Sequence, residues 1–504
     1  MGPLVAAVVL IGVSIWLAKK KTNKAPLPPG PPADPLIGHL RIIPQQKMQE
    51  TFQKWANKYG DIVYLEVLGR KMMILSSPEI AQALLENRGA NYSGRPKFTL
   101  YEVMGWVPVT TLLQPSDKRF LRHRKMFQQT FGPKECLTFD HDIADEAHLF
   151  IKNLTNAAPG THRNVIQRYT VSIVMRTSYG HRIRSDDDEF MKIADGIGVA
   201  MHKSGPPGNT PIDIFPWLQH MPSWFPGTYY MSVAKAEYKN VRKLFDFPVE
   251  FVQNRMKTEN YEDCFVSQKL QELDGNTDSE GLDDVKGASA TVFSAGVDTS
   301  YATLVHFALA MILHPECQKR AHEEIISVLG PNALPDLSDR ESLPYVEGIV
   351  QEVIRWNPVA ALGVPHLAIE DDIYEGMFIP KGTLMIPNIR GMGRHEKTYS
   401  DPDKFDPTRF LPQPQGRGEP HFAFGFGFGR RACPGRHFAS LMLWHAIACI
   451  LATLELAPAK DEKGDPKVPS LEFTEGLVSE PLPFDFEVHP RSEAAQRLIA
   501  HIDA

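Results

Sequence analysis

Phe424–Ala439 reads Phe-Gly-Phe-Gly-Phe-Gly-Arg-Arg-Ala-Cys-Pro-Gly-Arg-His-Phe-Ala, and this stretch decides how the rest of the chain is interpreted. Its alternating glycines leave the backbone almost free of side chains, which suits close approach by a flat, bulky group. Cys433 follows, just ahead of an apolar helical pattern over Arg436–Leu454. The positive helix end and nearby cations favour a thiolate there. Those cations are Arg430, Arg431 and Arg436. The stretch therefore predicts a metal-bound cysteine.

Three other interpretations of this stretch are weaker. A lone cysteine near a helix start is most often a small buried hydrophobe. A dinucleotide-binding loop counted from Gly425 would need its third glycine where Arg430 stands. A zinc site needs further cysteine or histidine partners at short spacing, and only His437 is near. What remains is a single axial thiolate on a planar metal cofactor.

The spacing Phe426-x-x-Gly429-x-Arg431-x-Cys433-x-Gly435 matches every defining position of a known haem-ligand signature, and the chain thereby resembles the cytochrome P-450 monooxygenases. The resemblance implies a mainly α fold with a small β-rich subdomain and haem b (iron protoporphyrin IX) as cofactor. It assigns Cys433 as the axial ligand of the iron, with Phe426, Arg431 and Gly435 in cofactor binding. It also implies insertion of one oxygen atom from O2 into an apolar small molecule.

Length and composition limit the class of protein. The chain has 504 residues, 43% of them hydrophobic, enough for one large core or several ordinary ones. Its net charge of -6 argues against a nucleic-acid-binding protein. The five cysteines are odd in number and scattered, so they do not indicate a disulfide framework. We therefore expect the working part of the chain in a reducing compartment.

Residues 1–19 have the pattern of a transmembrane anchor. The apolar run Leu4–Ala18 is followed at once by three lysines. At about 1.5 Å per residue such a helix is roughly 28 Å long, which just spans the hydrocarbon core. Lysines after the run, and not before it, argue against a cleaved signal peptide and place the remainder in the cytosol. With the family resemblance, this predicts a single-pass protein of the endoplasmic reticulum membrane.

Three further parts follow the anchor. Residues 20–35 form a basic, proline-rich linker, in which Pro26–Pro32 cannot continue a helix and favours an extended, stiff connector. Residues 36–490 resemble a haem-thiolate catalytic domain. Residues 491–504 form a C-terminal tail with the pattern of a surface helix.

Two segments of the domain have distinctive local patterns. Tyr64–Leu75 predicts two strands of a small sheet joined by a turn at Gly69 and Arg70. Ile212–Gly227 combines several prolines with large aromatic side chains, so it cannot be one helix. It favours a loop that touches a bilayer or lines an apolar entrance, with an ordinary buried loop as the alternative.

Asp284–Leu313 is the longest helical pattern and is free of proline until Pro315. Its centre contains Asp298 and Thr299 after Gly296, a residue that costs about 1 kcal/mol inside a helix. An acid and a hydroxyl there can hydrogen-bond a bound oxygen or water, and the hydroxyl can also open the local backbone ladder. By the resemblance, Asp298 and Thr299 are the catalytic pair that delivers protons during oxygen activation.

Glu352 and Arg355 lie three residues apart, on one face of a helix that we expect to begin with Ser342 as its N-cap. Alone, they would be an ordinary surface ion pair. The family pattern completes the pair with an arginine from a later loop, and Arg409 stands at about the expected distance. The resemblance thus implies a structural network that fixes the loop carrying Cys433.

Asp117–Phe131 carries several cations on a predicted helix, for which a solvated basic face is the plain alternative. The resemblance assigns Arg124 to a haem propionate. It places Phe120 where many relatives have tryptophan, so one hydrogen bond is missing or supplied elsewhere. His366 falls where the family often has another propionate partner, although a satisfied core histidine is the rival explanation.

The sequence contains no flavin or nicotinamide fingerprint, so the electrons come from another protein. By family analogy this is a membrane-bound, NADPH-dependent flavin reductase that docks on Arg119–Lys125, Arg430 and Arg436. Two other functions stay open: a haem-thiolate isomerase or dehydratase without a reductase, and a non-enzymatic haem sensor. Neither needs the pair Asp298 and Thr299.

Two short segments resemble fungal members that tailor secondary metabolites such as terpenoids or polyketides. These segments are Trp224–Gly227 and Arg355–Pro358. With the predicted anchor, the resemblance implies an apolar substrate that partitions from the membrane.

Overall fold

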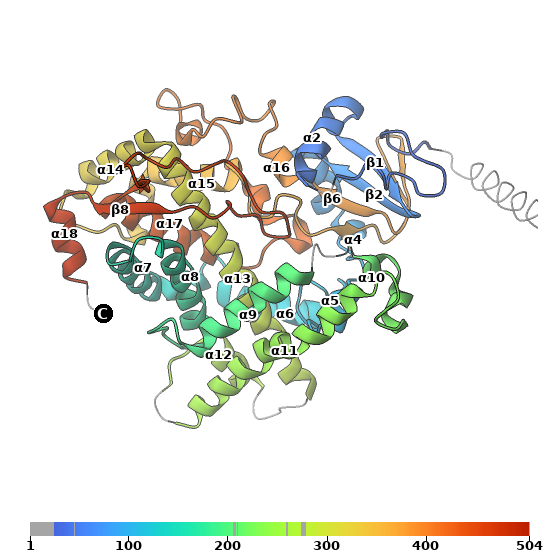
Figure 1. The fold of residues 1–504 in the computed structure, drawn as a ribbon, viewed down its shortest axis with the longest axis horizontal. Helices are drawn as coiled ribbons and strands as arrows, with labels where there is room; N and C mark the ends of the chain where they lie inside the picture. The colour runs from blue at the N-terminus through green and yellow to red at the C-terminus, as the bar shows by residue number, and fades with distance from the viewer. Residues whose placement is uncertain are drawn as a thin grey trace, which may run out of the picture.

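The computed structural model describes residues 25–44, 46–204, 208, 210–258, 261–273 and 279–502. Within them the fold is mainly α-helical with small sheets, as expected (Figure 1). The longer helices are α2 (Met48–Tyr59), α6 (Lys118–Phe131), α7 (Asp140–Thr155), α8 (His162–Tyr179), α9 (Glu189–Ser204), α11 (Tyr229–Met256), α12 (Phe265–Glu272), α13 (Ser279–Leu313), α14 (Pro315–Leu329), α15 (Pro344–Trp356), α17 (Arg436–Thr453) and α18 (Glu493–Ala500). Single helical turns are α3 (Pro78–Ala81), α4 (Gly89–Tyr92), α5 (Thr99–Val103), α10 (Pro211–Ile214), α16 (Ile389–Met392) and the π-helix η1 (Gln82–Asn87).

The largest sheet has the strand order β1-β2-β6-β3 and lies at the end of the molecule opposite α18 (Figure 1). The strands are β1 (Ile62–Val67), β2 (Arg70–Leu75), β3 (His366–Leu367), β4 (Asp372–Tyr374), β5 (Met377–Ile379), β6 (Leu384–Pro387), β7 (Leu454–Pro458) and β8 (Phe486–Pro490). The predicted hairpin is present, but Val67 pairs with Arg70, so its turn lies at Leu68 and Gly69. Both turn residues have positive φ, 49° and 82°, as tight hairpins require.

The central helix α13 begins earlier than predicted and packs against α6, α8, α11 and α17. Among the described helices, only its segment Glu280–Leu313 is long and apolar enough to cross a membrane, and 72% of that segment's most apolar window is buried. A helix that is apolar on all sides and buried belongs to the core of a large domain. We therefore treat α13 as a core helix.

The proline-rich connector is non-helical, as predicted, but it does not stand free of the domain. The N–H of Tyr64 donates to Pro29 O at 2.9 Å, which ties the connector to β1. Gly30 is required there, because an added Cβ would lie 2.2 Å from Tyr64 O. The predicted anchor, residues 1–19, lies outside the described residues.

The start of α15 differs from the sequence prediction. Its N-cap is Leu343, not Ser342, and no side chain of the capping residue bonds the helix. Glu324 of α14 supplies the acceptors instead: its carboxylate receives the N–H groups of Tyr345 at 2.9 Å and Val346 at 3.0 Å. The sequence could not show this because the cap comes from another helix.

The tail predicted as a surface helix is α18, which packs against α17. Ala495 and Ile499 are buried, while the remainder of its surface faces solvent.

Candidate active site

Cys433 follows two 3₁₀ turns, Ala423–Phe426 and Gly429–Arg431, and precedes the start of α17. Its N–H donates to Phe426 O at 2.8 Å, which closes the loop. Gly429 has φ 48° and lies against η1, since an added Cβ would be 2.8 Å from Leu85 O. At this glycine the close approach is therefore to the protein's own backbone.

The charges that act on Cys433 differ from those expected. Burial raises the pKa of the thiol, and the N–H of Gly435 and the charges of Arg124 and Arg436 oppose this rise. Of Arg430, Arg431 and Arg436, which the sequence pointed to, only Arg436 acts on the Cys433 thiol. The second arginine that acts on it, Arg124, belongs to α6. The side chain lies deep in the protein but is only partly covered by neighbouring atoms. Such a sulfur is open to a ligand from inside the molecule.

Three arginines and a histidine gather close to the Cys433 loop. Arg124 donates to Ala432 O at 2.8 Å. Arg431 donates to Ser93 O at 2.8 Å and Leu113 O at 2.7 Å. Arg95 is the third arginine of this cationic cluster, and His366 lies beside it. Burial, with smaller effects of Arg95 and Arg431, lowers the pKa of His366 well below its ordinary value.

Arg95 was not recognised in the sequence. It is 5% exposed and donates to Val364 O at 2.8 Å and Pro365 O at 2.7 Å. Burial and the neighbouring Arg431 lower the pKa of Arg95 strongly, and its Nε has no partner among the described residues. A basic residue between Gly94 and Pro96 was the only sequence signal.

The cationic cluster has no counter-charge of its own. Across the described residues, no carboxylate forms an ion pair with Arg95, Arg124 or Arg431. Buried cations without an anion are costly, so the arrangement favours an anionic ligand. The two propionates of haem fit this requirement, and the residues present therefore fit haem.

Phe120 packs against this cluster. The guanidinium of Arg431 lies 4.2 Å from the centroid of its ring. This cation–π contact positions Arg431 but supplies no hydrogen-bond donor.

The middle of α13 contains an exposed side chain among buried neighbours. Ala295 is exposed and Thr299, one turn later, is half-buried, whereas Val297 is buried. A Cβ on Gly296 would touch Val174 of α8 at 3.3 Å, so Gly296 faces α8 and not the accessible side of α13. Thr299 Oγ1 donates to Ala295 O at 2.8 Å, as expected for a hydroxyl that competes with the helical ladder. Ala295 and Thr299 therefore lie on an accessible part of α13.

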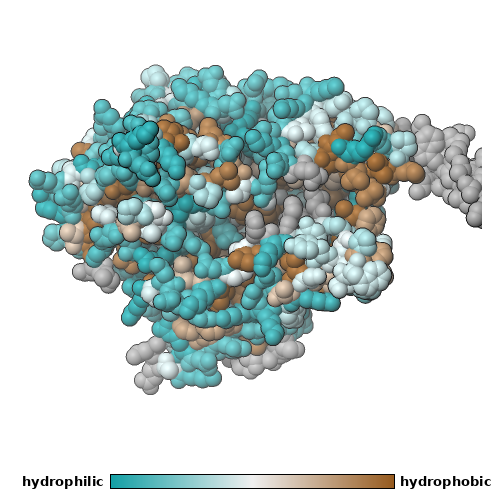
Figure 2. Space-filling model, in the orientation of Figure 1, coloured by the Kyte–Doolittle hydropathy of each residue, from teal (hydrophilic) through white to brown (hydrophobic). Residues whose placement is uncertain are grey.

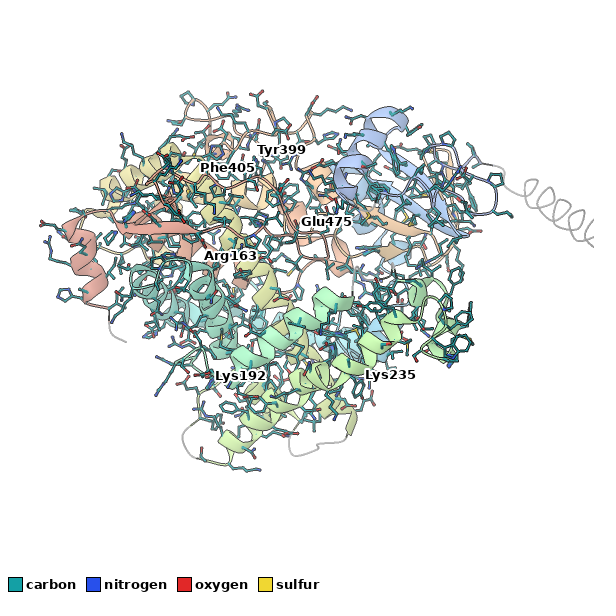
Figure 3. All side chains as sticks on the ribbon, viewed as in Figure 1. Arg163, Lys192, Lys235, Tyr399, Phe405 and Glu475 are labelled. Atoms are coloured by element: carbon teal, nitrogen blue, oxygen red, sulfur yellow. The ribbon has the colours of Figure 1, made fainter. Side chains whose placement is uncertain are left out.

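Asp298 has the most strongly shifted carboxyl pKa of the predicted site residues. Burial, followed by the charge of Glu480, raises the pKa of Asp298 from 3.8 to about 6. Glu480 is paired with Arg163 at 2.9 Å, and Arg163 also donates to Tyr301 OH at 3.0 Å. Arg163, labelled in Figure 3, comes from the first turn of α8. A chain of titratable groups thus leads from Asp298 towards partly exposed residues.

The structure brings Glu352, Arg355 and Arg409 together, all 0% exposed. Glu352 Oε2 receives Arg355 Nε at 2.7 Å, and Oε1 receives Arg409 Nε at 3.0 Å. Arg409 is further paired with Glu419 at 2.6 Å. The two guanidinium groups also bind carbonyls of residues 393–404, the segment that carries Tyr399 and precedes Phe405 (Figure 3).

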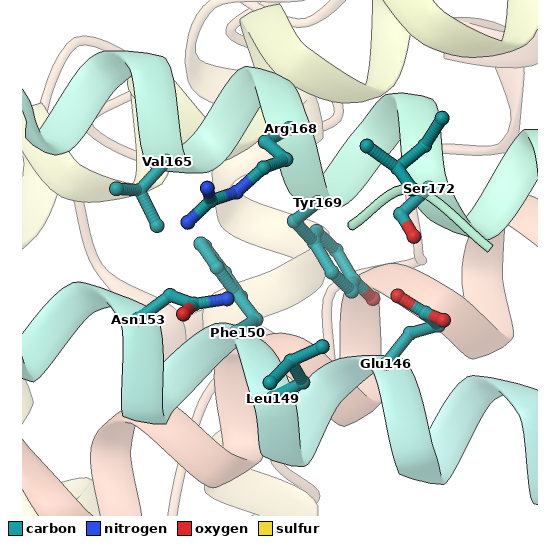
Figure 4. A pocket seen from close by; sticks show the side chains of 9 residues that line it. Glu146, Leu149, Phe150, Asn153, Val165, Arg168, Tyr169 and Ser172 are labelled. Atoms are coloured by element: carbon teal, nitrogen blue, oxygen red, sulfur yellow. The ribbon is translucent and has the colours of Figure 1, made fainter. Parts of the chain in front are cut away.

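Two other features lie away from this site. The cavity in Figure 4 is between α7 and α8, is lined by Glu146, Tyr169 and Ser172 among others, and measures about 20 Å³. That is room for about one water molecule, not for a substrate. Cys449 lies in the second half of α17 beside two histidines, fully buried in helix packing, so no flat cofactor can reach it.

Comparison with known proteins identifies the family. The sequence profile of the cytochrome P-450 family matches residues 28–488. Cytochrome P-450 monooxygenase 136 of Postia placenta is 36% identical over 97% of this chain and 93% of its own length. Cytochrome P-450 monooxygenase claR of Ampulloclitocybe clavipes is 34% identical over 94% and 88%, and COX2 of Coprinopsis cinerea is 33% identical over 98% and 95%. Similarity of this extent means that the chain belongs to the cytochrome P-450 family, whose members bind haem through a cysteine thiolate and are oxygen-incorporating oxidoreductases.

Proposed function

We propose that this protein is a membrane-bound, haem-thiolate monooxygenase with Cys433 as the axial ligand, acting on an apolar small molecule. The observation that carries the proposal is the anion-free cluster of Arg95, Arg124 and Arg431 beside Cys433. A cysteine next to buried cations that lack an anion is suited to a cofactor that brings both a metal and carboxylates. His366, Phe426 and Gly435 complete the proposed cofactor-binding residues.

When bound, the haem supplies the activation of O2 and its insertion into a substrate bond. The protein's part is to hold the sulfur, the carboxylates and the protons. Arg124 and Arg436, with the Gly435 N–H, stabilise the Cys433 thiolate against the cost of burial. The Phe426 carbonyl, bonded to the Cys433 N–H, fixes the backbone from which the sulfur projects. Arg95 and Arg431 would hold the carboxylates of the bound haem.

Asp298 and Thr299 are the proposed proton-delivery pair. With its pKa raised to about 6, the Asp298 carboxyl is partly protonated near neutral pH and can both give and take a proton. Glu480, whose pKa burial also raises, can reload it from the partly exposed side. The Thr299 hydroxyl, held on the Ala295 carbonyl, can donate to a bound oxygen or water when it turns away from that carbonyl.

The reaction class can be tested with isotopically labelled O2. The full chain is combined with a fungal flavin reductase and is supplied with NADPH and a panel of terpenoids and polyketides. We expect NADPH consumption that depends on substrate, and a product with one labelled oxygen atom by mass spectrometry. Substrate conversion that needs neither NADPH nor O2 would instead identify an isomerase or dehydratase.

Replacing Asp298 with asparagine should change stability in a pH-dependent way. Because the folded-state pKa of this carboxyl is raised, its ionisation opposes folding, and wild-type stability falls as pH rises from about 4 through about 6. The amide of the variant does not ionise, so it has no such penalty. We expect the difference in unfolding free energy between the variant and wild type to shift in favour of the variant by roughly 1–2 kcal/mol from pH 5 to pH 8. Urea unfolding of both proteins at each pH measures this difference.

The same variant separates a proton-delivery role from a structural one. If Asp298 delivers protons, the variant consumes NADPH but releases more hydrogen peroxide per product than wild type. An unchanged ratio of product to peroxide would exclude that role even if stability shifts as expected.

The proposed reductase-docking surface is smaller than the sequence indicated. Arg122 is bonded to Asp284 and is paired with Glu280 at 2.6 Å, so its charge is already balanced within the protein. Lys118, Leu121 and Lys125 lie on one exposed face of α6 at helical spacing. Leu121 is 61% exposed, an apolar centre between two lysines. Together with exposed Arg430, this face suits the acidic surface of a redox partner.

Charge reversal at Lys125 and Arg430 should therefore slow reductase-driven turnover by roughly tenfold at low salt, because it removes electrostatic steering. Peroxide-driven turnover, which needs no partner, should not change. Lys235→Glu, at an exposed lysine of α11 (Figure 3), serves as the matched control. Equal slowing in both assays would mean that the substitutions damage the site and not the docking surface.

Membrane contact is proposed for the side of the molecule where α10 lies next to the β1–β2 hairpin. Arg70 of β2 donates to the carbonyl of Gly208, three residues before α10 begins, at 2.9 Å. Exposed apolar residues gather there, and Figure 2 shows a hydrophobic group around β1 and β2. They are Leu27, Leu36, Leu40, Ile42, Phe215, Trp217, Trp224 and Tyr229. Aromatic residues flanked by cations are typical of a membrane interface.

With the predicted anchor at residues 1–19, this surface supports an endoplasmic reticulum location with the catalytic domain facing the cytosol. An apolar substrate would then enter from the lipid. A terpenoid or polyketide of a fungal secondary-metabolite pathway is the substrate class that we propose, from the resemblance of Trp224–Gly227 and Arg355–Pro358.

A further inference from the structure

His148 of α7 and His445 and Cys449 of α17 form a group of metal-ligand side chains outside the proposed haem site. One ligand atom of each lies within 4.8 Å of the other two. His445 and Cys449 are four residues apart and so share a face of α17. This face packs against α7, where the ring of His148 lies 5.8 Å from that of His445.

His445 has the hydrogen bonding expected of a metal ligand. It is 0% exposed, and its Nε2 bonds the carbonyl of Pro335 at 3.0 Å. A backbone carbonyl on one ring nitrogen is the usual means of fixing the tautomer of a metal-bound histidine. The other nitrogen, Nδ1, has no partner among the described residues. Its lone pair is buried and unused, a cost that a bound cation would remove.

We propose that His148, His445 and Cys449 bind one divalent zinc ion that links α7 to α17. Binding replaces the thiol proton by a zinc–sulfur bond and releases one proton to solvent. Nitrogen and thiolate ligands suit zinc, and water can take the fourth position. Bond lengths of about 2.0 Å to nitrogen and 2.3 Å to sulfur require the ligand atoms to close by about 1 Å. Half-buried His148 can make that movement and gives the ion access.

The site would stabilise the helix that carries the Cys433 loop at its start. It would leave the oxygen chemistry untouched, since Cys449 lies thirteen residues after the first residue of α17, or about 20 Å along the helix. The proposal therefore stands or falls independently of the haem assignment.

The test uses the full-length holoprotein without a histidine tag, freed of metal by a chelator and titrated with zinc against a chromophoric competitor. We expect one zinc ion per chain and at least a tenfold loss of affinity in His148→Ala, on the order of what loss of a ligand contact costs. His141→Ala is the matched control, because His141 is exposed on the same helix and should bind nothing essential. Equal affinity in wild type and His148→Ala would overturn the proposal and indicate adventitious surface binding.

Zinc K-edge absorption gives a second readout that does not depend on activity. We expect one sulfur neighbour at about 2.3 Å and nitrogen neighbours at about 2.0 Å, with the sulfur lost in Cys449→Ser. A spectrum of wild type without sulfur would contradict the assignment even if zinc binds tightly. The haem spectrum of His148→Ala should match wild type, which confirms that the variant folds.

Discussion

Glu352→Gln will lower the free energy of unfolding by about 3–5 kcal/mol, the cost of leaving a buried charge network without its central anion. Glu352 is 0% exposed and receives both Arg355 and Arg409, themselves 0% exposed. Glutamine keeps the volume but not the charge, so Arg409 would keep only Glu419 as a carboxylate partner and Arg355 would keep none among the described residues. The measurement is urea unfolding of the haem-loaded protein, together with the yield of folded protein.

The control is Glu323→Gln on α14, where the ion pair with Lys319 is exposed on both sides. We expect no measurable change there. Arg355→Lys keeps the charge but loses the two-pronged contact with Glu352, so its effect should be intermediate. If Glu352→Gln were as stable as Glu323→Gln, the network would not hold the segment before the Cys433 loop.

Cys433→Ser will abolish product formation with reductase and NADPH. A serine hydroxyl is a far weaker anionic donor than a thiolate, so the electron donation that favours splitting of O2 is lost. Haem should still be retained in part, because Arg95, Arg124 and Arg431 remain. Turnover and haem content measured on the same sample separate these effects.

Cys136→Ser is the matched control, since Cys136 is a buried free cysteine 1% exposed and bonded only weakly to Pro133 O. It should keep both haem and turnover. Residual turnover of Cys433→Ser comparable to that of Cys136→Ser would place the active thiolate elsewhere.

Features that depend on local pattern could be predicted from the sequence. The Cys433 loop, the hairpin over Tyr64–Leu75 and the long helix around Asp298 each have a signal within a few turns of chain. The hairpin turn was predicted at Gly69 and Arg70, one residue too late, because the sequence does not show which residue takes the left-handed conformation.

The contact of Glu352 with the distant Arg409 was implied by the family resemblance and is confirmed. Other features that depend on residues far apart could not be predicted. Arg95 gains its meaning only when the fold brings it to Arg431, which lies in a distant part of the sequence. Arg122 looked like a free docking charge because Asp284, its partner, lies on another helix. The cap of α15 by Glu324 is a third case. In each, the sequence shows a group but not the distant neighbour that decides its role.

The most direct test of the central claim is the absorption spectrum of the reduced, full-length protein under carbon monoxide. If Cys433 ligates the iron as a thiolate, the Soret band appears at the strongly red-shifted position that defines haem-thiolate proteins, and Cys433→Ser abolishes it. A Soret band at the shorter wavelength of a neutral axial ligand, or one that is equally red-shifted in Cys433→Ser, would contradict the assignment.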